Sequence, residues 1–170
     1  EPWATTLATA DRKGRVTARV VLLKDFDARG FCFYTNLLSR KGRQLAENPR
    51  AALCFYWEAF LEQARIEGRV RPVSDNEADA YWASRPRESQ IASLASAQSK
   101  PLSSRRELLA RAAAVRARFR GRLIPRPPHW SGCRLVPDAV EFWKAGPHRL
   151  NHRTLYRKQG SRWSRRLLYP

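Results

Sequence analysis

The sequence predicts a mostly antiparallel β-barrel with helices inserted between its strands. Short β-prone runs recur about every eight to twelve residues, with turn residues between them, which is typical of a barrel or a sandwich. Helical segments that open with N-capping residues interrupt these runs. The chain has 170 residues, 43% of them hydrophobic and 28% charged, which excludes a wholly disordered chain. We therefore expect a single domain over residues 1–170.

The first third of the chain is predicted to consist of strands joined by turns. Strands are expected over residues 3–9, 16–24 and 31–35, where β-prone residues gather. Turns are expected over 11–14 and 25–30, and Gly30 can supply the positive φ that the second turn requires.

The middle of the chain is predicted to alternate helix and strand. Ser39 is placed to cap a helix over residues 40–47, which Asn48 and Pro49 end. The run 51–57 is apolar on both faces and is expected at the centre of the sheet. The run 63–70 alternates apolar and charged residues, as a half-buried strand does.

Two capping boxes predict further helices. Ser74 with Glu77 opens a helix to about residue 84, and Ser104 with Glu107 opens a longer, arginine-rich helix to about residue 119. Pro86 separates the first of them from a short helical stretch over 89–97, for which Ser89 is the expected cap. After a stiff proline-rich connector, strands are expected over residues 133–136, 139–144, 154–157 and 162–168.

Composition narrows the class of protein. The net charge of +18 indicates either a solvated basic surface or an anionic partner, such as a phosphorylated small molecule or nucleic acid. The three cysteines stand far apart without CxxC spacing, so we expect no disulfide framework and a cytoplasmic protein. No apolar run approaches the roughly 20 residues of a membrane-spanning helix. Because the sequence contains no Met, we expect the segment to begin inside a longer protein.

A first candidate site is Ser39-Arg40-Lys41-Gly42-Arg43, at the start of a predicted helix. The positive end of a helix dipole and its unpaired N–H groups disfavour cations in the first turn. A bound anion would remove this conflict, because N–H groups, hydroxyl and cations would then converge on it. The alternative is a basic face that binds nothing.

Two more clusters could bind ligands. Tyr81 and Arg85 share a helical face, and Ser89 follows shortly after, so a phenol, a guanidinium and a hydroxyl could hold a phosphate. An ordinary Arg-Pro helix end is the alternative. Further along, Trp143 offers a flat apolar surface, and Arg149 and Arg153 could meet an anionic or aromatic ligand. Here the alternative is a core tryptophan beside solvated loop arginines.

Other chemistries find little support in the sequence. His129, His148 and His152 have no Cys or carboxylate neighbours at metal-ligand spacing. His148 and His152 are four residues apart, but Gly146, Pro147 and Asn151 indicate a loop, so no metal is expected. The sequence has no nucleophile elbow, P-loop or GxGxxG motif. Its basic residues are spread over the whole chain and match no nucleic-acid reader motif, so nucleic acid is not the expected partner.

The order of these motifs resembles the pyridoxamine 5′-phosphate oxidase family. The resemblance extends over the whole segment, in order and at compatible spacing. It rests on Arg19-Val20-Val21-Leu22-Leu23-Lys24, Phe33-Tyr34-Thr35-Asn36, Ser39-Arg40-Lys41, Asn48-Pro49-Arg50, Tyr81, Ser84-Arg85-Pro86-Arg87-Glu88-Ser89-Gln90-Ile91, Gln98-Ser99, Pro125-Arg126-Pro127-Pro128-His129-Trp130, Glu141-Phe142-Trp143, Arg149-Leu150 and Pro170. It implies an FMN-binding split β-barrel that forms a homodimer with FMN at the subunit interface. The N-terminal extension of the family would lie outside this segment.

The resemblance also implies an activity and the residues that support it. The activity is oxidation of pyridoxamine or pyridoxine 5′-phosphate to pyridoxal 5′-phosphate, with O2 as electron acceptor. The residues that would contact FMN are Arg19, Val20, Val21, Leu22, Leu23, Tyr34, Thr35, Arg40, Lys41, Gln63, Gln98, Ser99, Trp143 and Arg153. Lys24, Tyr81, Arg85 and Ser89 would bind the substrate phosphate, and Arg149 would lie against the pyridine ring.

One position departs from the family pattern. The family usually reads Arg-Leu-His-Asp-Arg where this chain has Arg149-Leu150-Asn151-His152-Arg153, so Asn151 replaces a substrate-side histidine. An amide can donate a hydrogen bond but does not titrate near pH 7. The sequence therefore leaves alternatives open. These are a related FMN-dependent oxidase with another substrate, such as a phenazine precursor, a non-catalytic module that binds FMN or pyridoxal phosphate, and a basic nucleic-acid-binding domain.

Overall fold

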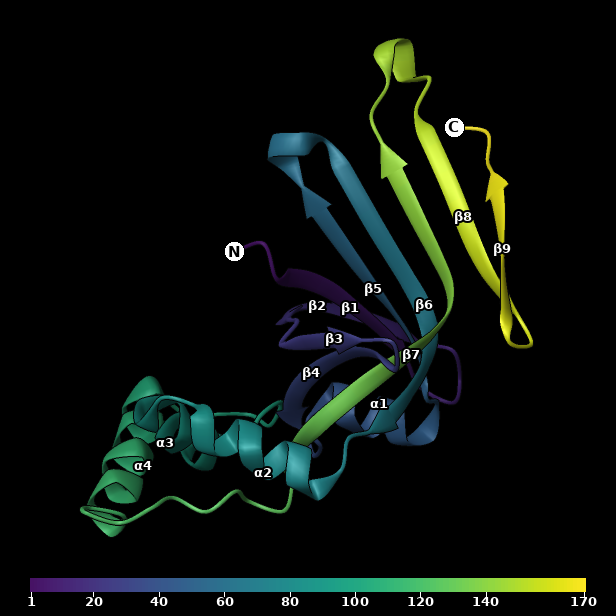
Figure 1. The fold of residues 1–170 in the computed structure, drawn as a ribbon. Helices are drawn as coiled ribbons and strands as arrows, with labels where there is room; N and C mark the ends of the chain where they lie inside the picture. Colours follow the sequence, from purple (N-terminus) through teal and green to yellow (C-terminus); the bar gives the residue numbers. More distant parts are fainter. The chain divides into compact units, whose positions relative to one another are not determined.

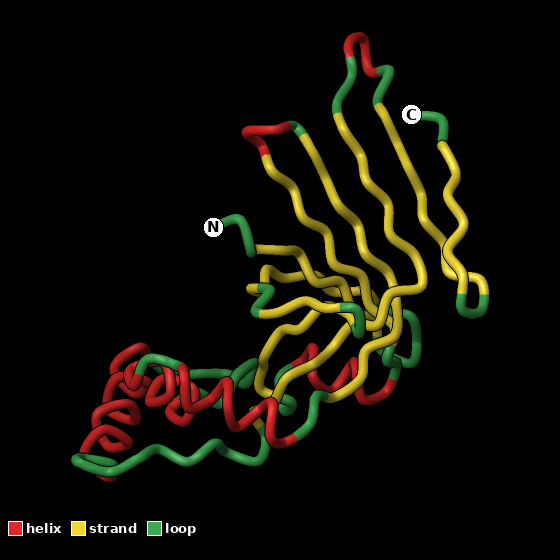
Figure 2. Tube along the Cα trace, viewed as in Figure 1, coloured by secondary structure: helices red, strands yellow, loops and turns green.

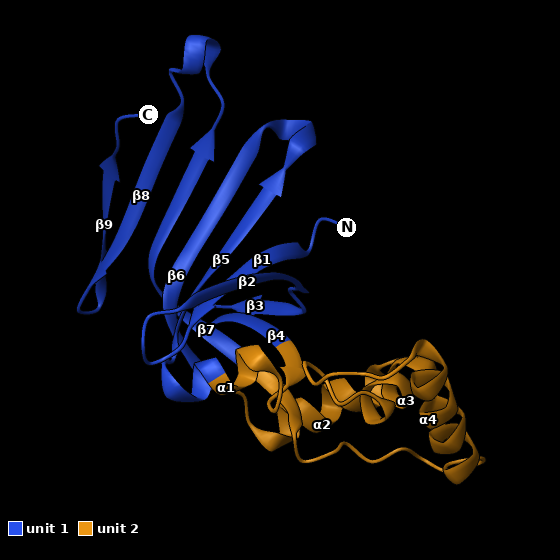
Figure 3. Cartoon of the chain, turned by 180° about the vertical axis from the view of Figure 1, so that it is seen from behind, with its two compact units in different colours: residues 1–33, 44–71, 133–170 blue, residues 34–43, 72–132 orange.

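The computed structural model describes residues 1–170 and divides into two compact units (Figure 3). Unit 1 comprises Glu1–Phe33, Gln44–Arg71 and Cys133–Pro170, and unit 2 comprises Tyr34–Arg43 and Pro72–Gly132. The expected mostly-β chain with inserted helices is confirmed (Figure 2). That both units form one domain stays a prediction.

A sheet of nine strands forms the larger part of the structure (Figure 1). Its main path runs β2-β1-β5-β6-β7-β4-β3, and β8 and β9 extend it as a hairpin from β7. The predicted central strand, β5, indeed lies between β1 and β6, to which it pairs antiparallel. The strands are β1 (Ala4–Ala10), β2 (Val16–Leu22), β3 (Asp25–Asp27), β4 (Gly30–Asn36), β5 (Arg50–Trp57), β6 (Glu62–Pro72), β7 (Trp130–Lys144), β8 (His152–Gln159) and β9 (Arg162–Leu167).

The α-helices begin close to where the capping residues predicted them. They are α1 (Arg40–Glu47), α2 (Asp75–Ser84), α3 (Arg87–Ala95) and α4 (Arg105–Arg118), and two short 3₁₀ turns lie at Glu58–Phe60 and Pro147–Arg149. Ser74 and Glu77 form the predicted reciprocal capping box at α2. At α4 only half of the predicted box forms, because the Glu107 carboxylate accepts from the Ser103 hydroxyl instead of the Ser104 backbone.

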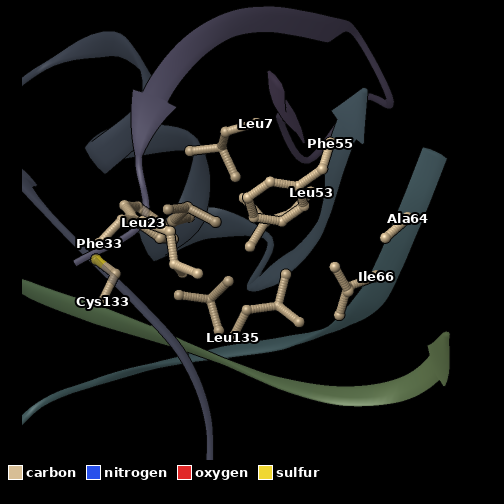
Figure 4. Close-up of a cluster of buried hydrophobic side chains, with 11 residues drawn as sticks. Leu7, Leu23, Phe33, Leu53, Phe55, Ala64, Ile66, Cys133 and Leu135 are labelled. Atoms are coloured by element: carbon tan, nitrogen blue, oxygen red, sulfur yellow. The ribbon is translucent and has the colours of Figure 1, made fainter. Parts of the chain in front are cut away.

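The strands of unit 1 bury one cluster of apolar side chains (Figure 4). Strand β1 alternates, with Thr5, Leu7 and Thr9 buried and the residues between them more exposed. Leu7, Phe33 and Leu135 are fully buried in the structure. This alternation follows from the two-residue period of a strand, which sends every second side chain to the core.

Three predicted boundaries were wrong. The two strands expected over 133–136 and 139–144 form one strand, β7, because extended backbone accommodates the φ of Pro137. The turn expected over 25–30 contains the short strand β3, which pairs with β4. Helix α3 begins at Arg87 after Pro86, and not at Ser89, because proline is favourable where a helix needs no N–H donor.

Two glycines allow β7 to pass close to its neighbours in unit 1. A Cβ atom on Gly30 would lie 2.2 Å from the carbonyl oxygen of Leu135, and one on Gly68 would lie 2.0 Å from that of Val136. Any side chain at either position would force backbone atoms apart. Gly30 also has the positive φ, +135°, that the sequence predicted for this turn.

None of the helices is both long enough and apolar enough to span a membrane.

Candidate functional site

The N-terminus of α1 gathers polar groups from distant parts of unit 2. The backbone N–H of Arg40 donates to the Ser99 hydroxyl at 3.1 Å. The Lys41 ammonium donates to the Gln98 side-chain oxygen at 3.1 Å and to the Ser39 hydroxyl at 3.3 Å. Ser39 caps the helix as predicted, by accepting from the Gly42 N–H at 3.3 Å. Four predicted FMN contacts, Arg40, Lys41, Gln98 and Ser99, therefore lie together.

The chemistry of this cluster fits a phosphate monoester. The first turn of α1 contains no acidic residue, so its partial positive charge adds to the charges of Arg40 and Lys41. Ser99 has a φ of +69°, a strained conformation for a residue with a side chain. Residues held in such conformations concentrate at ligand sites, and here the conformation places the hydroxyl on the N–H of Arg40.

The second cluster in unit 2 is a set of stacked aromatic rings that encloses Arg85. The Tyr34 and Tyr81 rings stack with centroids 3.9 Å apart, and Trp130 stacks on Tyr34 at 5.5 Å. The Arg85 guanidinium lies 4.7 Å from the Trp130 centroid and 5.2 Å from that of Trp82. Such cation–π contacts fix the plane of the guanidinium while leaving most of its N–H donors available.

Arg85 has no carboxylate partner, and its environment is partly dehydrated. Burial lowers the pKa of Arg85, and the neighbouring Tyr81 opposes this shift. Burial likewise raises the pKa of the Tyr81 phenol, against the effect of the Arg85 charge. A guanidinium removed from water without a carboxylate is costly, and a bound anion would offset the cost.

Ser89 lies in the first turn of α3 and is half-buried, but its hydroxyl does not bond Arg85. Arg85 donates instead to the hydroxyl of Ser93, at 3.0 Å. Ser93 was not predicted as a site residue, although it stands one helical turn after Ser89 and therefore on the same face. Trp130 was not predicted as a site residue either, and it stands 45 positions after Arg85.

In unit 1, Arg19 is bound into a network between β1 and β2. Its guanidinium donates to the Leu7 carbonyl at 3.0 Å, to the Thr9 hydroxyl at 2.7 Å and to the Thr17 hydroxyl. Both hydroxyls donate in turn to the Gln44 side-chain oxygen, at 2.6 and 2.7 Å. Arg19 is thus oriented by the Leu7 carbonyl and by the two threonine hydroxyls.

The other predicted flavin and substrate contacts on or next to β2, β4 and β6 differ in their exposure to solvent. Val20, Leu22 and Lys24 are exposed, Val21 is half-buried and Leu23 is buried, as the alternation of a strand requires. Thr35, on β4, is buried. Gln63, on β6, is half-buried and pairs with Tyr56 on β5.

The third cluster lies where β7 and β8 pair. Trp143 and Arg153 face each other in the register of these strands. The Arg153 guanidinium donates to the buried Glu141 carboxylate at 2.7 Å, and Arg65 donates to the other carboxylate oxygen at 2.7 Å. The hydrogen bond to Glu141 raises the pKa of Arg153 further above its usual range.

Arg149 and Asn151 lie in the loop between β7 and β8. Arg149 is exposed and has a φ of +66°, in the left-handed region. The Asn151 side-chain oxygen accepts from the Gly146 N–H at 3.1 Å, and the Asn151 N–H donates to the Arg149 carbonyl at 2.8 Å. Asn151 therefore closes the loop that carries Arg149.

Comparison with known proteins gives one consistent result. A sequence profile of pyridoxamine 5′-phosphate oxidase matches residues 1–119, and a profile of the pyridoxine 5′-phosphate oxidase C-terminal dimerisation region matches residues 130–170. A pyridoxine/pyridoxamine 5′-phosphate oxidase of Myxococcus xanthus is 55% identical over all of this chain and 82% of its own length. One from Alkalilimnicola ehrlichii is 56% identical over 98% of this chain and 86% of its own.

Two solved structures share the fold. PhzG from Burkholderia lata, solved with tetrahydrophenazine-1-carboxylic acid, is 39% identical, with a TM-score of 0.94 over 99% of this chain and 83% of its own. An FMN-binding protein from Nostoc punctiforme, 19% identical, has a TM-score of 0.80 over 99% of this chain and 89% of its own. The predicted split β-barrel is thereby confirmed. The chain belongs to the pyridoxine/pyridoxamine 5′-phosphate oxidase family, a family of oxidoreductases.

Proposed function

We propose that this protein is an FMN-dependent oxidase. It would convert pyridoxamine or pyridoxine 5′-phosphate to pyridoxal 5′-phosphate, with O2 as electron acceptor, in the synthesis or salvage of vitamin B6. The observation that supports the proposal is the presence of two clusters of cationic side chains suited to an anion, one at Arg40 and Lys41 and one at Arg85. Cofactor and substrate are both phosphate monoesters, so the reaction requires two such sites.

The FMN phosphate would be held at the N-terminus of α1. Arg40, Lys41 and Ser99 supply the charges and the hydroxyl, with Gln98 fixing the Lys41 ammonium. Arg19 would add a further positive charge, and its guanidinium is oriented by the Leu7 carbonyl and the Thr9 hydroxyl. The bound flavin would accept the electrons removed from the substrate and pass them to O2.

The ring of the cofactor would be contacted by the remaining residues that the family resemblance implies. Val20, Val21, Leu22, Leu23, Tyr34, Thr35, Gln63, Trp143 and Arg153 are the proposed contacts. Strand β2 pairs on one side only, with β1, so the backbone groups of its other edge are available to a ligand. Arg153, positively charged and fixed by Glu141, would stabilise negative charge on the ring.

The substrate phosphate would be bound by Arg85, Tyr81, Ser89 and Lys24. Arg149 would lie against the pyridine ring, and Asn151 would hold the loop of Arg149 in place. No side chain is required as a nucleophile. The contribution of the protein would be to bind the two rings in contact and to orient the substrate.

The protein would act as a homodimer with FMN at the subunit interface. Large apolar side chains of the segment that matches the dimerisation profile are exposed in the single chain. Phe142 is 52% exposed, Trp163 43% and Leu167 75%. A second copy of the chain would cover such side chains, which are uncommon as a group on a monomer surface.

A second candidate is oxidation of a reduced phenazine precursor. It is favoured by the likeness to PhzG, which extends over nearly the whole chain at 39% identity. Asn151, which stands where the family usually has histidine, lies in the loop that would contact the substrate ring. The two candidates share the flavin site and differ in substrate.

The visible absorption spectrum of the purified protein tests the proposal. We expect a yellow protein whose flavin band bleaches when pyridoxamine 5′-phosphate is added without oxygen and returns with oxygen, releasing hydrogen peroxide. Bleaching only by a reduced phenazine carboxylic acid would favour the second candidate. Bound flavin or pyridoxal phosphate without turnover would indicate a binding module. A colourless protein that does not take up FMN at saturating concentration would refute the proposal.

A further inference from the structure

Ser93 on α3 has no role in the function proposed above, yet its hydroxyl contacts Arg85. We infer that Ser93 is a positioning residue that orients the Arg85 guanidinium toward the phosphate of the substrate. The inference rests on the proposed function for the identity of the substrate. It concerns a contact within unit 2 alone.

The hydrogen bonds around Ser93 have a defined direction. The Ser93 hydroxyl donates its single proton to the Ser89 carbonyl at 2.9 Å, one helical turn earlier. Its lone pairs are then left to accept from the Arg85 Nη1 at 3.0 Å. Because a hydroxyl has only one proton, this arrangement makes Ser93 an acceptor toward Arg85.

The aromatic rings complete the orientation. Trp130 and Trp82, with centroids 4.7 and 5.2 Å from the guanidinium carbon, restrict the plane of the group. They do not restrict its rotation within that plane. The hydrogen bond to Ser93 restricts this rotation. Because an arginine has five N–H donors, the other donors stay available for an anion.

A fixed guanidinium binds a phosphate more tightly than a mobile one. The conformational entropy of the long arginine side chain is then lost on folding and not on binding. Without Ser93, Arg85 would still carry its charge but would have to be ordered by each substrate molecule. Removal of the Ser93 hydroxyl should therefore weaken binding of the phosphorylated substrate and leave the rate of the chemical step unchanged.

The test compares Ser93→Ala with wild type in the full chain loaded with FMN. We expect KM for pyridoxine 5′-phosphate to rise roughly fivefold to tenfold, with kcat and the Kd for FMN unchanged. Pyridoxine without its phosphate should be oxidised equally by both proteins. Ser93→Thr, which retains a hydroxyl able to bond the preceding turn, should restore most of the affinity.

Ser84→Ala is the matched control. The Ser84 hydroxyl also donates to a carbonyl in the preceding turn, that of Tyr81 at 2.8 Å, but forms no hydrogen bond with the Arg85 guanidinium. We expect its KM to equal that of wild type. An equal rise of KM in the Ser84 and Ser93 variants would overturn the inference, because it would indicate a general loss of helix stability.

Pyridoxal 5′-phosphate binding, followed by tryptophan fluorescence, separates this inference from the proposed function. Trp82 and Trp130 lie beside Arg85 and would report the ligand. Weaker binding to Ser93→Ala would support the inference even if the protein oxidises no B6 phosphate. Unchanged binding to Ser93→Ala, together with weaker binding to Arg85→Ala, would overturn it even in an active oxidase.

Discussion

Glu141 and Arg153 form an ion pair in which the carboxylate is almost completely buried. The Arg153 Nε lies 2.7 Å from one carboxylate oxygen, and Glu141 is 3% exposed. Arg65 pairs with the second oxygen at 2.7 Å, so one buried carboxylate on β7 binds two arginines, one from β6 and one from β8. The direction in which Arg153 points is therefore set by Glu141.

Glu141→Gln should weaken FMN binding and lower stability. The amide keeps the shape but removes the carboxylate that pairs with Arg153 and leaves Arg65 with Glu67 as its remaining counter-charge. Because both arginines are partly exposed, we expect a loss of about 1–2 kcal/mol in the free energy of unfolding, below the range for fully buried pairs. Urea denaturation and FMN titration measure the two effects. Glu67→Gln is the control, since Glu67 pairs with Arg65 at the surface, at 3.0 Å. Equal values for both variants would contradict this role of Glu141.

Arg85→Ala should raise KM for the phosphorylated substrate by roughly tenfold or more, because a charged hydrogen-bond donor to the phosphate is lost. The Arg40 and Lys41 cluster uses other residues, so flavin should remain bound. Steady-state kinetics and the flavin absorbance of the purified variant measure both. Loss of flavin from this variant would argue against two separate phosphate sites.

Asn151→His should raise kcat/KM for pyridoxine 5′-phosphate. A neutral histidine can accept the Gly146 N–H through Nδ1, as the asparagine oxygen does now, and can present Nε2–H to the substrate. Asn151→Ala removes the acceptor and should lower kcat/KM by releasing the loop of Arg149. Steady-state assays compare the three proteins. An unchanged or lower kcat/KM for the histidine variant would show that Asn151 does not limit turnover.

Thr5→Val should stabilise the protein. The Thr5 hydroxyl is buried and has no hydrogen-bond partner, which costs free energy that a methyl group would not. We expect the free energy of unfolding to rise by about 1 kcal/mol, measured by urea denaturation. Thr9→Val is the matched control on the same strand, and it should destabilise, because the Thr9 hydroxyl bonds Arg19 and Gln44. Destabilisation by both variants would contradict the prediction.

Tyr81 should ionise only above the usual range of a tyrosine. Burial raises the pKa of its phenol, so the folded state favours the neutral form. Its contribution to stability is complete below the ordinary pKa of about 10 and is lost as the pH rises through the folded value. The difference in alkaline ultraviolet titration between wild type and Tyr81→Phe isolates this group. A midpoint at or below 10 would contradict the burial described for Tyr81.

Local rules predicted most of the fold. Ser39, Ser74 and Ser104 marked the starts of three helices because capping depends on a few adjacent residues. The short strand β3 was not predicted, since Asp25 and Asp27 have low strand propensity and are held by pairing with β4. The partners on β4 are close in sequence, since Asp27 pairs with Gly30, but the propensities of the β3 residues do not indicate this pairing.

The candidate site was only partly predictable. Arg40 and Lys41 stand in the first turn of a helix, where the dipole disfavours cations, and this local feature predicted a bound anion. The contact of Ser99 with Arg40 joins residues 59 positions apart and required the fold. The bond of Arg85 to Ser93 was missed because a serine on a helix gives no signal until its neighbours are placed.

Gly30 and Gly68 are not among the residues assigned to cofactor or substrate, yet they lie against β7 just before the stretch that carries Glu141 and Trp143. A methyl group added at either glycine would displace that stretch of β7 and would change the orientation of the Glu141 and Trp143 side chains. Variants at these two glycines would therefore resemble variants of the proposed flavin site, although their cause is a steric clash between backbone segments. Supplying extra flavin would do little to rescue them.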